Sequence, residues 1–160
     1  VTGELFSLGE RVPVPSFRDE TFKLSGITLA AQLREGPSTG DPPFLVGRLL
    51  VIPKMEPVYK AGSELAYYFQ VYHAATDPQS GEARLDLSYR FLVAEKVQKS
   101  GELTFTPLGR PLTFTDQPGL VHGYSFPLTG WPAGDFKLQV TATDRVTGRQ
   151  ADSEVRFSVR

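Results

Sequence analysis

The chain of 160 residues contains no cysteine. This absence excludes a disulfide framework, zinc sites built on thiolates and a cysteine nucleophile. No apolar run approaches the roughly 20 residues that a membrane-spanning helix requires, so we expect no membrane insertion. Charge of one sign is also lacking, because 17 Lys and Arg residues stand against 18 Asp and Glu residues. Without a basic stripe, we expect no nucleic-acid partner.

Recognisable catalytic and metal-binding patterns are equally scarce. The two histidines, His73 and His122, lie in no nucleophile context, and no G-x-S-x-G motif is present. The glycines are isolated in turns, which argues against a phosphate cradle. Carboxylates are scattered, although a calcium ion at a loop end formed by Asp41, Asp77 or Asp144 is an open alternative. We therefore predict no catalytic residue, no metal and no cofactor, and hence a chain that is not an enzyme.

The sequence does contain a period-two alternation of apolar and polar residues, typical of half-buried β-strands. It is clearest near the C-terminus, where 136–143 and 154–159 flank a turn over 144–149 that contains Gly148. We predict an antiparallel hairpin there.

Similar patterns predict the remaining strands. The segments 64–74 and 84–94 are predicted to form a hairpin across the turn 76–81. The apolar run 44–52 is expected to be a central strand covered on both faces. Further strands are predicted at 120–128 and in an edge hairpin of 103–106 with 112–115. Segment 22–34 is also predicted to be a strand, with a short helix over 29–34 as the alternative. Eight or nine strands with no long helix predict an all-β fold, an antiparallel β-sandwich, with a closed barrel as the alternative.

The N-terminal segment lacks so regular a pattern. Residues 1–20 include Pro13 and Pro15, which limit regular structure. We expect 1–20 to be a leader or linker and 21–160 to be the sandwich domain. Because the chain begins with Val1 and not with Met, we expect it to be either an excised module of a larger protein or a processed product.

One motif carries a family resemblance. Its residues are Leu128, Pro132, Gly134, Phe136, Leu138, Val140 and Asp144. They resemble the L-x-P-G-x-Y-x-L-x-V-x-x-x-D entry to the penultimate strand of immunoglobulin-like and fibronectin-type sandwiches. Phe136 replaces the family's tyrosine, so the corner hydrogen bond of that tyrosine cannot form. The resemblance implies an immunoglobulin-like antiparallel β-sandwich.

Two further phrases, 66–72 and 132–136, look like the C-terminal sandwich modules of exported bacterial proteins that follow von Willebrand factor A-type or GWxTD-type regions. That resemblance implies a modular, bacterial, extracytoplasmic setting: secreted, periplasmic or in the cell envelope. It transfers no active-site residue.

The candidate interaction surface is aromatic. Tyr68, Gln70 and Tyr72 alternate on the outward face of the strand 64–74, and Trp131 lies in a turn. Such side chains suit protein contacts and sugar stacking. The competing interpretations are that the leader or a neighbouring domain covers this face, and that Trp131 closes one end of the sandwich. We predict a noncatalytic structural or protein-interaction module whose partners are neighbouring domains or another protein, with carbohydrate binding as the alternative.

Overall fold

The computed structural model describes residues 19–36, 44–96 and 103–160. The predicted leader therefore lies almost wholly outside the described residues. These residues form two β-sheets and no helix, and thus no helix long and apolar enough to cross a membrane occurs in this part of the chain. The strands are β1 (Lys23–Leu24), β2 (Thr28–Glu35), β3 (Leu45–Val46), β4 (Leu49–Pro53), β5 (Val58–Tyr59), β6 (Glu64–Tyr72), β7 (Arg84–Lys96), β8 (Leu103–Pro107), β9 (Leu112–Pro118), β10 (Val121–Pro127), β11 (Gly134–Asp144) and β12 (Gln150–Val159).

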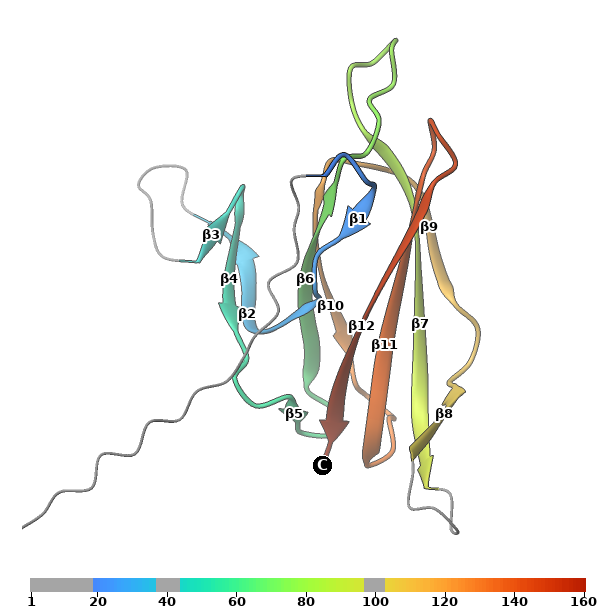
Figure 1. Cartoon of the computed structure of the whole chain (residues 1–160). Helices are drawn as coiled ribbons and strands as arrows, with labels where there is room; N and C mark the ends of the chain where they lie inside the picture. The colour runs from blue at the N-terminus through green and yellow to red at the C-terminus, as the bar shows by residue number, and fades with distance from the viewer. Residues whose placement is uncertain (1–18, 37–43, 97–102) are drawn as a thin grey trace, which may run out of the picture.

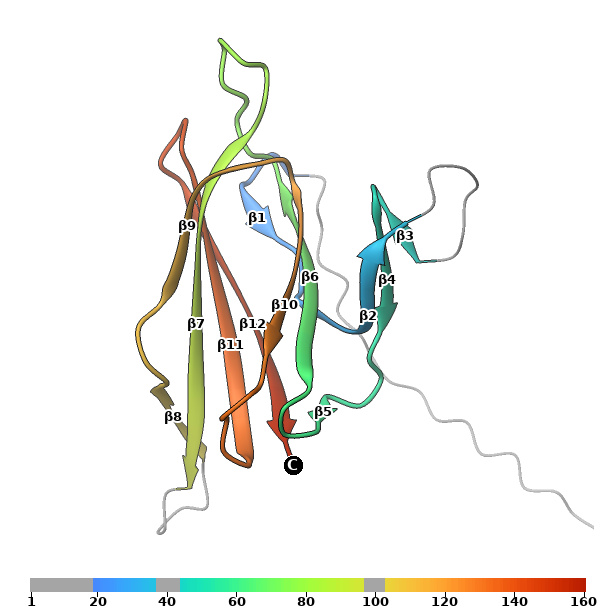
Figure 2. The ribbon, with the colours of Figure 1, turned by 180° about the vertical axis from the view of Figure 1, so that it is seen from behind.

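The two sheets lie face to face (Figures 1 and 2). In the first sheet, β6 pairs with β10 along one edge and with β1 and β2 along the other, and β4 and β3 follow β2. In the second sheet, β11 lies between β7 and β12; β5 runs parallel to β12, and β8 and β9 both pair with β7. The predicted all-β sandwich is confirmed. Three of the additional strands, β1, β3 and β5, have two residues each, too few for an alternating pattern to reveal.

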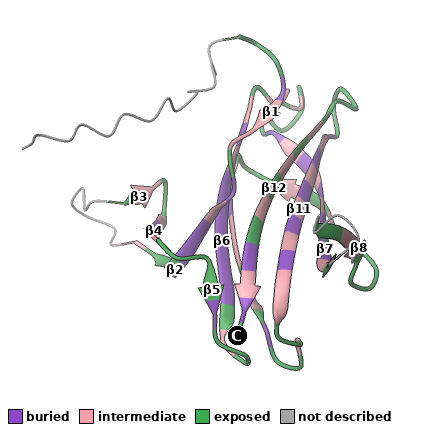
Figure 3. Ribbon diagram, turned by 60° about the horizontal axis from the view of Figure 1, so that its bottom comes forward, coloured by how far each residue is buried: buried purple, intermediate pink, exposed green. Residues whose placement is uncertain are grey.

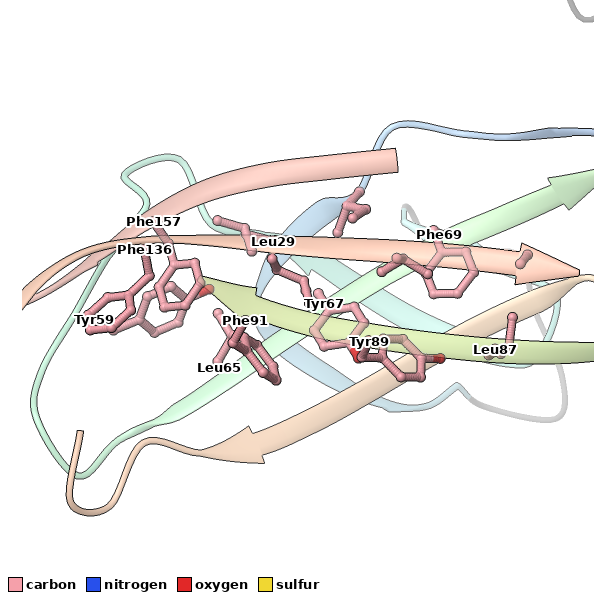
Figure 4. Packing of buried hydrophobic residues seen from close by; sticks show 14 of the residues in the cluster. Leu29, Tyr59, Leu65, Tyr67, Phe69, Leu87, Tyr89, Phe91, Phe136 and Phe157 are labelled. Atoms are coloured by element: carbon pink, nitrogen blue, oxygen red, sulfur yellow. The ribbon is translucent and has the colours of Figure 1, made fainter. Parts of the chain in front are cut away.

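The core lies between β6 and the sheet of β7, β11 and β12. Tyr67 and Phe69 of β6 and Tyr89 of β7 are fully buried and meet across the layers (Figure 4). In β11 the buried residues alternate as predicted, since Phe136, Leu138, Val140 and Ala142 all have 0% exposure. Each large apolar side chain buried in this way stabilises the fold by roughly 1.5–3 kcal/mol. The predicted closing hairpin is also confirmed, because β11 pairs with β12 from Gly134 to Thr143.

A second layer covers the outer face of β6. After Ala30 the chain of β2 bulges and leaves β6 to pair with β4 instead. We call β3, β4 and the part of β2 beyond Ala30 the limb, and it stands beside the sandwich (Figure 1). Strand β6 is consequently buried along most of its length, whereas β12 alternates between exposed and half-buried residues until Phe157 and Val159, which are buried (Figure 3).

The predicted hairpin of segments 64–74 and 84–94 is wrong. The two strands, β6 and β7, belong to opposite sheets, and only an isolated bridge between Thr76 and Ala83 joins the chain at their ends. Both strands direct their apolar faces into the same core. An alternating pattern predicts which side chains face the core. It does not distinguish two strands paired within one sheet from two strands packed face to face in opposite sheets.

The predicted central strand at 44–52 is also wrong. The segment folds back on itself, with Val46 paired to Leu49 across the two-residue loop of Gly47 and Arg48. Gly47 has a φ of 60°, which a tight hairpin of this length requires at its first loop position. The apolar run is thus divided between β3 and β4 of the limb.

The predicted edge hairpin of 103–106 with 112–115 is wrong as well. Strands β8 and β9 pair one after the other with β7, which is long enough at 13 residues to hold both on one edge. The internal similarity of the two segments reflects their shared partner and not a mutual pairing.

Candidate functional site

Three of the four predicted surface residues lie together on the outer face of β6. Tyr68 is 9% exposed, because Ala30 of β2 and Val51 of the limb pack with it in a second apolar cluster. This burial raises the pKa of Tyr68 to about 12, with a smaller contribution from neighbouring Tyr72. The face is therefore outward relative to the core, as predicted, but the chain itself covers part of it.

A glycine permits this close cover. Gly123 of β10 lies opposite Tyr68, and a Cβ atom at that position would be 3.0 Å from Leu33 Cδ2 and 3.0 Å from Leu49 Cδ1. The limb thus packs directly on the backbone of β10.

The remaining part of the predicted surface lies beyond the limb. Tyr72 is half-buried, and its hydroxyl donates a 2.6 Å hydrogen bond to Gln70 Oε1. This bond fixes the two side chains relative to one another. Tyr72 and Gln70 are the more accessible members of the predicted set.

Trp131 lies elsewhere, at one end of the sandwich. Its ring centroid is 5.1 Å from that of Phe91 and 5.0 Å from that of Phe136, and the side chain is half-buried. It packs against the core beside aromatic residues of the second sheet and does not join the three residues of β6. Carbohydrate binding through these aromatics stays a prediction, and stacking a sugar on Tyr68 would require the limb to move.

Sequence reasoning missed three exposed apolar residues, one just before β3, one in β4 and one just after β4. Phe44 is 58% exposed, Ile52 is 37% exposed and Met55 is 90% exposed. We call these three residues the limb surface. The signal for Phe44 and Ile52 in the sequence was the apolar run 44–52, which was assigned to a buried strand, and Met55 lies three residues beyond that run.

A crevice of about 600 Å³ opens between the limb and the outer face of β6 and β10. Its walls include Leu33 of the limb, Tyr59 of β5 and Ala66 of β6, and its polar groups include Lys54 and Lys60. Glu64 also lines it and accepts a 2.8 Å hydrogen bond from Ser125 Oγ. We call this space the limb crevice, and no pattern in the sequence indicated it.

The opposite sheet carries a polar groove on its outer face. Its side chains largely satisfy one another: Thr141 Oγ1 donates to Asp152 Oδ1 at 2.6 Å, and Gln139 Nε2 donates to Glu154 Oε2 at 3.1 Å. Such cross-strand pairs are typical of a solvated sheet face.

The histidines do not form a metal centre. Among the residues that the structure describes, no group of three or more His, Cys, Asp and Glu side chains could hold an ion. His122 stacks on Phe69, and its Nε2 lies 3.1 Å from the carbonyl oxygen of Gly119. Burial lowers the pKa of His122, and that hydrogen bond opposes the shift.

The proposed calcium ligands have structural partners instead. Asp77 Oδ1 accepts the backbone N–H of Gln79 at 2.7 Å within its own turn. Asp144 is fully buried and accepts hydrogen bonds from Ala75, Val146 and Thr147. Asp41 lies outside the described residues.

Comparison with known proteins gives similarity of fold. No family model and no curated protein matches the chain. A superoxide reductase (neelaredoxin) from Ignicoccus hospitalis matches at 9% identity and a TM-score of 0.40, over 84% of this chain and 83% of that one. The sporulation control protein Spo0M from Bacillus subtilis matches at 14% identity and a TM-score of 0.41, over 87% of this chain and 49% of that one. An AA10 lytic polysaccharide monooxygenase from Streptomyces lividans matches at 16% identity and a TM-score of 0.39, over 68% of this chain and 60% of that one.

These neighbours correct one prediction. They include proteins named as a reductase and as a monooxygenase, so the prediction that the chain is not an enzyme does not stand. At such low similarity they assign no activity to this chain either, because one fold hosts many functions. Its enzyme status is unresolved.

Proposed function

We propose that this chain is a protein-interaction module of a larger, exported bacterial protein, and that it docks on a neighbouring domain or another protein through the limb surface. The observation that carries the proposal is the conformation and exposure of Phe44. Its φ is 68°, a left-handed conformation that a bulky residue adopts at a cost of about 1–2 kcal/mol.

Local hydrogen bonding holds this strained backbone in place. The N–H of Val51 donates a 2.9 Å bond to the carbonyl oxygen of Phe44, which fixes the start of the limb hairpin. The ring nevertheless stays 58% exposed, so it contributes little to the core. Backbone strain of this kind clusters at functional contacts, which supports a docking role.

Met55 adds to the same surface. It is 90% exposed just after β4. Its flexible thioether side chain can adapt to the shape of a partner surface. These exposed apolar groups contrast with the polar groove on the opposite sheet, whose side chains hydrogen-bond to one another. The resemblance of 66–72 and 132–136 to modules of exported bacterial proteins supports the modular, extracytoplasmic setting.

Site-specific photo-crosslinking in the producing organism tests this function. A benzophenone amino acid replaces Met55 in one strain and Arg90, an exposed residue of the opposite sheet, in a control strain. We expect one discrete crosslinked product from position 55 and background labelling from position 90.

A second substitution, Phe44→Gly, tests whether the crosslinked product at position 55 depends on the limb surface. Phe44→Gly removes the ring and relieves the positive φ, so the variant should fold at least as well as the parent. We expect it to reduce crosslinking at position 55 about tenfold, which corresponds to the loss of one apolar anchor of a partner contact. Crosslinking at position 55 that equals the control, or that ignores Phe44→Gly, overturns the proposal.

A further inference from the structure

Two strands diverge at the limb crevice and leave their facing edges without a partner. Strand β2 pairs with β6 from Thr28 to Ala30 and then bulges toward β4. Beyond that point no described strand pairs with β2 on the side away from β4. The first residues of β6, Glu64 and Leu65, likewise pair only with β10 among the described strands.

The pairing pattern shows which backbone groups of β2 face the crevice. Gly36 donates its N–H to the carbonyl oxygen of Arg48 at 2.7 Å, and Arg34 lies opposite Leu50 two residues earlier. Because hydrogen-bonded pairs alternate in an antiparallel ladder, Arg34 bonds to β4 while Leu33 directs its N–H and C=O the other way. Consistent with this, Val51, which lies opposite Leu33, donates its N–H to the carbonyl oxygen of Phe44, the residue before β3, and not to β2.

The charge in the crevice is positive. Lys54 Nζ lies 4.9 Å from the centre of the Tyr59 ring, and neither Lys54 nor Lys60 pairs with a carboxylate of the described residues. The one carboxylate, Glu64, is bonded to Ser125. Two ammonium groups against this single carboxylate leave the crevice with an excess of positive charge, which favours an anionic ligand.

The remaining walls suit an extended segment with apolar side chains. Ala31, Val58 and Ala66 are small or branched apolar residues lining the crevice, whose 600 Å³ lies within the roughly 300–1,000 Å³ of ligand sites. The hydroxyl of Tyr59 is buried and has no hydrogen-bond partner, although buried hydroxyls normally have one.

We propose that the limb crevice binds an extended, acidic peptide segment, which adds as a strand to the free edge of β2 and places its carboxylates at Lys54 and Lys60. Strand addition supplies backbone hydrogen bonds from the peptide to Leu33, and the two lysines select for acidic side chains. This site shares no residue with the limb surface, so Phe44→Gly leaves it intact and either proposal can fail without the other.

Selection from a displayed library of short random peptides, panned on the whole chain, provides the probes. We expect the selected sequences to contain Asp or Glu at two or more positions among β-branched residues. Selection of no peptide, or of peptides without acidic residues, overturns the proposal.

Charge-reversal variants locate the binding. We expect K54E/K60E to weaken binding of a selected peptide at least about tenfold in fluorescence anisotropy, whereas R90E/R110E, which changes the charge equally outside the crevice, changes it less than about twofold. Equal effects of the two double variants would show attraction to the whole chain and not to this site.

Amide hydrogen exchange tests the strand addition itself. On peptide binding we expect the Leu33 amide to slow at least about tenfold while the Arg34 amide, already bonded to β4, stays unchanged. Binding without protection of Leu33 contradicts strand addition. Equal competition by octanoate, an apolar carboxylate with no peptide backbone, would assign the crevice to small organic anions instead.

Discussion

The backbone N–H of Ala75 donates a 3.0 Å hydrogen bond to Oδ2 of Asp144, although the two residues are 69 positions apart. Ala75 follows β6 of the first sheet, and Asp144 ends β11 of the second. The same carboxylate accepts the N–H of Val146 at 2.9 Å and the hydroxyl of Thr147 at 2.7 Å. A buried carboxylate thus joins the two sheets at one end and organises the β11–β12 turn.

Asp144→Asn tests the strength of this junction. The amide keeps the shape of the side chain, but its NH₂ group is a donor where the carboxylate had an acceptor oxygen. That NH₂ group would face N–H and O–H groups that donate to the carboxylate in the parent chain. We expect the free energy of unfolding to fall by about 2–3 kcal/mol, as for a buried hydrogen-bonded charge. Urea denaturation measures this loss, and Asp152→Asn on the exposed face is the control, with an expected loss below about 0.5 kcal/mol. Equal losses in the two variants would contradict the structural role.

The pH dependence of stability follows from the same carboxylate. Burial opposes ionisation of Asp144 and is the largest single influence, but the hydrogen bonds from Ala75, Thr147 and Val146 together outweigh it and lower its pKa below 3.8. A carboxyl whose folded pKa is depressed stabilises the fold above its unfolded pKa, and this stability is lost as the pH falls toward the folded value. Below about pH 4 we therefore expect the parent chain to lose stability more steeply than Asp144→Asn, in urea titrations from pH 7 to pH 3. Parallel curves over that range would exclude a depressed pKa at this position.

The sequence predicted which residues face the core more reliably than which strands pair. Period-two alternation placed Leu65, Tyr67 and Phe69 inward, and all three have 0% exposure. It could not place β6 and β7 in opposite sheets, because facing a common core and pairing edge to edge give the same alternation. Pairing depends on packing between distant segments, which no local pattern encodes.

The candidate site was predictable only in part for a similar reason. Alternation placed Tyr68 and Tyr72 on the outer face of β6, but the cover of Tyr68 depends on the bulge after Ala30. That bulge lies in a run of Ala30, Ala31 and Gln32 without a glycine or proline to mark it. The limb and its crevice arise from this one irregularity.

His122 provides a second pH-dependent prediction. Burial against Phe69 lowers its pKa below 6.5, partly opposed by the hydrogen bond to Gly119. The unfolded chain then binds the proton more readily, so the stability due to His122 is present above pH 6.5 and is lost as the pH falls toward the folded pKa. We expect the His122 ring protons to titrate with a midpoint below 6.5 in NMR spectra, assigned with a His73→Ala variant. A midpoint at or above 6.5 would contradict the burial of a neutral ring.

The contact between the limb and β10 leads to the last prediction. A methyl group at Gly123 would lie 3.0 Å from Cδ2 of Leu33 and from Cδ1 of Leu49, closer than carbon atoms normally pack. Gly123→Ala should therefore displace the limb at a cost of about 1–3 kcal/mol, the usual effect of overpacking. Because the displaced elements lie outside the sandwich core, we expect faster trypsin cleavage after Arg34 and Arg48 without loss of the near-ultraviolet spectrum of the core aromatics. Gly26→Ala is the matched control, since a methyl group there meets no atom within 4 Å. If Gly123→Ala and Gly26→Ala are cleaved at the same rate, the limb does not depend on close contact with β10, and the cover of Tyr68 must be maintained by its strand pairing alone.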